Sequence, residues 1–91
     1  MITSFFMYDV YRLCKALHNH TPNDTALAAF IRWLETDPTR SDLLEAPDRR
    51  AQMKGYIKAL EPLLQQGENK IWMCEVILRE IEIEEEDTDS D

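Results

Sequence analysis

Two histidines and two cysteines are the side chains best suited to metal or nucleophilic chemistry. Cys14 lies one helical turn before His18, and His20 follows two residues later. Such a Cys/His pair could bind a metal ion, but structural zinc needs four ligands, and no CxxC or HxxxH pattern supplies the others. His18 also fits the end of a helix, where a cation meets the negative end of the helix dipole. We therefore expect at most a minor metal-binding role.

The cysteines and hydroxyls form no recognisable catalytic pattern. Cys14 and Cys74 lie inside apolar stretches, and two cysteines make no disulfide framework. A free thiol in such surroundings behaves as a small hydrophobe, so we expect two reduced core thiols. The chain has no GxSxG motif, no phosphate-binding loop and no convincing nucleophile–base pair. We therefore expect a protein that is not an enzyme and has no catalytic, cofactor or metal residues.

The net charge of −8 is concentrated near one end of the chain. Residues 80–91 hold eight acidic residues and no basic one, whereas residues 1–79 hold ten of each. A neutral body disfavours direct nucleic-acid binding, which needs a net basic face. The acidic segment is either a solubilising tail or a ligand that engages a basic protein surface.

A basic stripe precedes the acidic segment. Arg50, Lys54 and Lys58 recur every four residues, with Arg49 adjacent, so a helix would gather them on one side. The stripe is either a solvated face or a docking surface for acid. The docked acid would be the chain's own tail or that of a neighbouring molecule.

The spacing of apolar residues predicts the helices that position these side chains. We expect helices over about residues 5–18, 22–36, 48–66 and 69–83, and a short helical turn near 41–46. Thr21 as N-cap and Pro22 at the first helical position are typical of a helix start. Trp72, Val76 and Ile83 form a second apolar stripe on the last helix, separate from its main core stripe.

Two features of the later helices are less regular. Pro62 should kink the third helix or divide it near Ala59, and the apolar stripe stays in phase across Pro62, which favours a kink. A strand is the alternative to the last helix, because Glu and Ile alternate over residues 80–83. Beyond Ile83 we expect the helix to fray, since glutamates four residues apart repel one another and oppose the helix dipole.

These patterns predict an all-α fold: a small single-domain four-helix bundle with a kinked third helix and a disordered acidic C-terminal tail. The helical domain would cover residues 1–83 and the tail residues 84–91. No signal peptide is visible, and no apolar run approaches the roughly 18–20 residues that span a bilayer. We therefore expect a cytoplasmic protein with no membrane contact.

The number of large aromatic residues exceeds what so small a core must bury, which indicates an interface. We expect a small inhibitor or adaptor, for example of an anti-defence type, that occupies a partner protein with a basic surface. The expected partner-binding residues are Tyr8, Tyr11, Trp33, Trp72, Val76, Glu80, Glu82, Glu84, Glu85, Glu86 and Asp87. The alternative is a structural homodimer held by the first and last helices, in which the acidic tail only solubilises.

Overall fold

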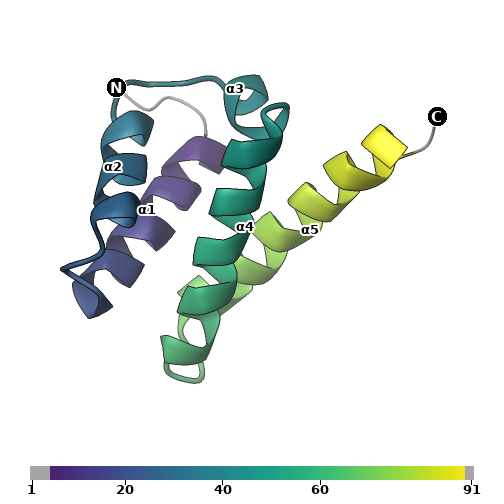
Figure 1. Cartoon of the computed structure of the whole chain (residues 1–91). Coiled ribbons are helices and arrows are strands. Elements are labelled where there is room, and N and C mark those ends of the chain that lie inside the picture. The colour runs from purple at the N-terminus through teal and green to yellow at the C-terminus, as the bar shows by residue number, and fades with distance from the viewer. Residues whose placement is uncertain (1–4, 90–91) are drawn as a thin grey trace.

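The computed structural model describes residues 5–89, with side chains from Phe6 to Glu86, and this range contains five α-helices and no strand. The elements are α1 (Phe5–His20), α2 (Thr25–Leu34), α3 (Arg40–Leu44), α4 (Pro47–Leu60), the 3₁₀ turn η1 (Glu61–Leu63) and α5 (Asn69–Asp89) (Figure 1). The prediction of an all-α fold is confirmed. The four longer α-helices correspond to the four predicted helices, and α3 corresponds to the short helical turn predicted near residues 41–46.

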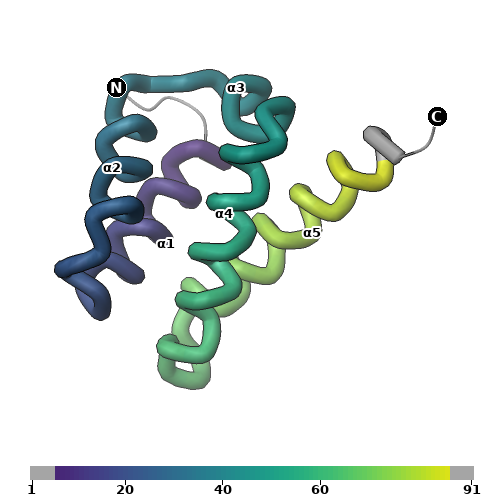
Figure 2. The backbone as a smooth tube through the Cα atoms, in the orientation of Figure 1, coloured from purple at the N-terminus to yellow at the C-terminus, as the bar shows by residue number. Residues whose placement is uncertain are grey.

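The helices pack around α1 and α4. α1 contacts α2, α4 and α5, and α4 also contacts α3 and α5. The path of the chain in Figure 2 shows α5 starting beside the end of α4 and then diverging from it toward its C-terminal end. Each α-helix contributes to one buried cluster, as Leu13, Phe30, Leu43, Ile57 and Ile81 illustrate. The core therefore covers the inner face of α5 and leaves its other face uncovered.

The start of α2 differs from the prediction. Asp24, rather than Thr21, is the N-cap, and its carboxylate accepts a hydrogen bond from the Leu27 amide at 3.0 Å. The Thr21 hydroxyl instead donates to the Leu17 carbonyl at the end of α1. Both residue types cap helices well, so local propensity did not decide between them.

The favoured prediction, that the third helix kinks at Pro62, is wrong, and the alternative, a division near Ala59, is what the structure shows. α4 ends at Leu60, and the chain continues through η1 to Leu64, whose backbone is extended. Proline has no amide proton and its ring crowds the carbonyl four residues earlier, which is enough to stop the helix here. Gly67, with φ of 89°, then turns the chain into α5, a backbone conformation that glycine adopts without strain.

The predicted disordered tail is not confirmed for residues 84–89, where α5 continues as far as Asp89. The strand alternative for residues 80–83 is excluded by the same helix. Ile81 is fully buried and anchors this part of α5 to the core. Glutamates on either side of it form ion pairs with other helices, which offsets the like-charge repulsion within α5. The last two residues of the predicted tail lie outside the described range.

Candidate functional site

α5 carries apolar side chains on two opposite faces. Successive residues of an α-helix are rotated by about 100°, so Trp72, Val76 and Ile83 fall within an arc of about 40°. This group is called the outer stripe. Its members expose 66%, 37% and 48% of their surface, respectively. The buried residues of the inner face, Cys74, Ile77 and Ile81, lie on the opposite side of the helix.

A shallow hollow accompanies the outer stripe. Its volume is ≈ 290 Å³, and it is lined by Trp72, Glu75, Val76, Arg79, Glu80 and Ile83. Every lining residue belongs to α5, so the hollow follows the surface of a single helix. Such a surface can receive side chains from another molecule, but it is too open to enclose a small substrate.

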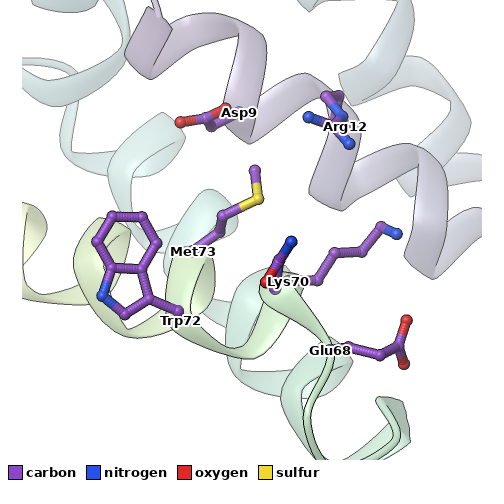
Figure 3. Close-up of a pocket in the computed structure, with 7 residues that line it drawn as sticks. Asp9, Arg12, Glu68, Lys70, Trp72 and Met73 are labelled. Atoms are coloured by element: carbon purple, nitrogen blue, oxygen red, sulfur yellow. The ribbon is translucent and has the colours of Figure 1, made fainter.

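Trp72 also lines a larger hollow between α5 and α1, of ≈ 610 Å³. Asp9 and Arg12 border it from α1, and Lys70 and Met73 border it from α5 (Figure 3). In this view Met73 points toward α1, and Trp72 lies beside it. The surface around the outer stripe therefore extends from α5 onto α1.

One set of α5 glutamates forms ion pairs with α3. Arg40 donates a hydrogen bond to Glu80 at 2.7 Å and lies 3.6 Å from Glu84. The Arg40 guanidinium also stacks over the Phe6 ring, 5.0 Å from its centroid, so this arginine joins α1 to α5. Sequence reasoning missed Arg40, because no helical spacing relates it to either glutamate.

Glu85 forms the second link, to the basic stripe of α4. Lys54 donates to Glu85 at 2.8 Å, and Arg50 lies 3.9 Å from it while donating to the Leu44 carbonyl at the end of α3. The hydrogen bond from Lys54 lowers the pKa of Glu85, and the charges of Lys54, Arg50 and Lys58 lower it further. The structure thus places part of the acidic segment against two of the four predicted docking bases.

The other two predicted docking bases lie elsewhere. The Arg49 guanidinium stacks over Trp33 at 4.2 Å from the ring centroid, and no ion pair in the described range links it to an acid. Lys58 is exposed and acts on Glu85 only through its charge. Arg49 therefore covers an aromatic ring, a contact that sequence spacing alone could not reveal.

A different set of glutamates borders the outer stripe. Glu75, Glu82 and Glu86 fall within an arc of about 40° on one side of it, and this set is called the acid line. All three are exposed, and their side chains make no hydrogen bond or ion pair with the side chains described from Phe6 to Glu86. Arg79 lies between the acid line and the stripe. The described glutamates of α5 are thus divided by helix geometry into an internal set and an outward-facing set.

The remaining predicted partner-binding residues are spread over α1 and α2. Tyr8 is 47% exposed, with Arg12 stacked over its ring at 5.6 Å. The Tyr11 hydroxyl donates to Glu35 at 2.7 Å, which raises the pKa of this phenol. Trp33 is half-buried beside Phe30. The side chain of Asp87 lies outside the described range.

The two cysteine thiols are poorly placed to act as nucleophiles or metal ligands. Both are buried and free, and burial raises the pKa of Cys14 to about 12 and that of Cys74 to about 11. The protonated thiol is a poor nucleophile and a poor metal ligand. Among the described residues, no group of three or more His, Cys, Asp or Glu could hold a metal ion.

None of the helices in the described part of the chain combines the length and apolar character needed to cross a membrane. No protein-family model, curated protein or solved structure matches the chain.

Proposed function

We propose that the chain is a non-enzymatic protein-binding module that occupies a partner's surface with the outer face of α5. The exposure of the outer stripe carries the proposal. Trp72 exposes 66% of its surface on a helix whose opposite face is already buried, so the fold itself does not use this ring. Tryptophan is enriched among the residues that dominate binding energy at interfaces. A small inhibitor or adaptor, for example of an anti-defence type, has this kind of surface.

The charge around the stripe supports a partner with a basic surface. The exposed acid line runs along one side of the apolar contact residues, with Arg79 between them, and would steer a positively charged partner and speed association. Two free, buried cysteines suit a reducing compartment, so the proposed location is the cytoplasm. Direct binding to nucleic acid is not part of the proposal, because the outward-facing acids would repel phosphate.

The test is affinity capture from an extract of the native host, with the intact chain compared with Trp72→Ser/Val76→Ser. Both side chains are exposed, so the double variant should keep its fold, as circular dichroism and thermal melting can verify. Leu63→Ser is the matched control, because Leu63 is 46% exposed but lies on η1. We expect the double variant to lose the captured partner and the control to retain it. Equal capture by all three chains would contradict the proposal.

A homodimer is the second candidate, since the exposed Tyr8 on α1 and Trp72 on α5 could also contact a second copy. Sedimentation of the purified chain distinguishes the two functions. A dimer that dissociates when Trp72 is replaced by serine would favour the homodimer. A monomer at all concentrations reached would exclude it over that range.

A further inference from the structure

Three of the described α5 glutamates are paired within the chain and three are not, and this difference indicates what kind of partner the outer stripe binds. Glu80, Glu84 and Glu85 are occupied by Arg40, Arg50 and Lys54, so a partner that recruits them must first break contacts within this chain. The acid line, Glu75, Glu82 and Glu86, has no such contacts in the described range. A partner can therefore engage the acid line while the ion pairs that hold α5 on the body remain intact.

Helix geometry shows what a second copy would meet at this surface. In an antiparallel pair related by a two-fold axis, the same flank of each helix lies on the same side of the interface. The acid line of one copy would then face the acid line of the other, six carboxylates against two copies of Arg79. In a parallel pair the acid line would face the flank that carries Glu80, whose charge is already offset by Arg40. The antiparallel arrangement therefore places like charges beside the apolar contact, which weakens it, and the parallel arrangement offers the acid line no unpaired base among the described residues of Glu80's flank.

A complementary partner carries basic side chains where the acid line meets it. The outer stripe is a narrow line of apolar side chains on one helix, the form that a hydrophobic groove accepts. The acid line borders the stripe on one side only, while Glu80 on the other side is paired with Arg40. Basic side chains on one lip of such a groove would meet the three outward-facing glutamates.

We propose that α5 docks into an apolar groove of a different protein, with Lys or Arg side chains along the single lip that faces Glu75, Glu82 and Glu86. This inference rests on the proposed function and adds to it the shape and charge of the partner's site. It takes a different protein, not a second copy of this chain, as the occupant. The internal glutamates Glu80, Glu84 and Glu85 hold α5 in place and take no direct part in recognition.

The experiment uses the full chain itself as the probe. The variant Glu75→Lys/Glu82→Lys/Glu86→Lys presents the same apolar stripe bordered by a basic line. It reproduces the charge proposed for the partner's lip, on a helix in place of a groove. We expect the wild type alone and the variant alone to sediment as monomers, because an antiparallel pair of either chain with its own copy sets like charges against each other. We expect their mixture to form a 1:1 complex at least about tenfold tighter than either self-association. About 1 M salt, where screening acts over roughly 3 Å, should weaken the complex.

The control variant Glu45→Lys/Asp48→Lys/Glu61→Lys makes the same change in net charge away from the outer face of α5. We expect it to form no complex with the wild type. A complex with this control, a wild-type homodimer, or a mixture that stays monomeric would each overturn the inference.

Replacing Trp72 with serine in both chains separates this inference from the proposed function. Loss of the mixed complex would show that the stripe and the acid line act together, as proposed. A mixed complex that survives the replacement would contradict the role of the stripe and with it the proposed function. A mixture that stays monomeric, while capture from the host extract still depends on Trp72, would overturn the proposal that the partner carries basic side chains on its lip. It would leave the proposed function standing.

Discussion

Glu85 shows that part of the acidic segment holds the fold together. In the sequence it is one of eight acids in a terminal block with no bases. In the structure it lies against Lys54 and Arg50, about one third exposed, and it fastens the last turns of α5 to α4. The basic stripe on α4 was visible in the sequence. The sequence did not show which acid would pair with this stripe, because Lys54 and Glu85 are thirty-one positions apart and their contact depends on how α5 crosses α4.

The lowered pKa of Glu85 predicts a pH-dependent contribution to stability. A carboxyl group with a depressed folded-state pKa contributes fully above its ordinary value of 4.5 and loses that contribution as the pH falls through the folded-state pKa. We expect Lys54→Met to lower the melting temperature by about 1–5 °C at neutral pH. The difference from wild type should shrink below pH 4.5 as Glu85 becomes protonated.

The measurement is thermal unfolding of both chains between neutral pH and the acid range. Lys58→Met is the control, because Lys58 acts on Glu85 only through its charge and should give a smaller difference. A Lys54→Met difference that stays constant down to the lowest pH would contradict the assigned ion pair.

The helices themselves could be predicted from the spacing of apolar residues, since each long helix buries a face with a regular repeat. The ends were less predictable. Thr21 and Asp24 are both good caps, and Pro62 can either kink or stop a helix. The sequence predicts too short an α5, because it shows the repulsion among the glutamates of this helix but not the base that offsets it. That base is Arg40, which lies on α3 and pairs with Glu80 and Glu84 only in the folded chain.

Gly55 offers a test at the scale of a single helix. It lies in the interior of α4, is exposed, and a Cβ added there would meet nothing within 4 Å. Gly55→Ala should therefore stabilise the chain by about 0.5–1 kcal/mol, because alanine loses less backbone freedom on folding. Urea denaturation measures the change. Gly67→Ala is the matched control and should destabilise the chain, since Gly67 has φ of 89°. A destabilised Gly55→Ala variant would contradict the free space that the structure shows around this position of α4.

At the scale of the whole molecule, α5 joins the core to the outer surface. Its inner face completes the core, its internal glutamates hold α3 and α4, and its outer face presents an apolar stripe beside the acid line. The sequence indicated this outer stripe, because Trp72, Val76 and Ile83 share a side of any helix through them. It could not indicate which acids face outward, since that depends on where Arg40 and Lys54 lie in the folded chain.

The accessibility of Trp72 is the most direct test of the central proposal that the outer face of α5 is a docking surface. The chain has two tryptophans, so Trp33→Phe leaves Trp72 as the sole indole and keeps an aromatic ring beside Phe30 and Arg49. Quenching of its fluorescence by acrylamide, a neutral molecule, reports exposure without interference from nearby charges. We expect efficient quenching in the free chain at every concentration, and strong protection with a blue-shifted emission in the complex with the captured partner. An indole that is protected in the free chain, or that stays equally accessible in the complex, would contradict the proposal.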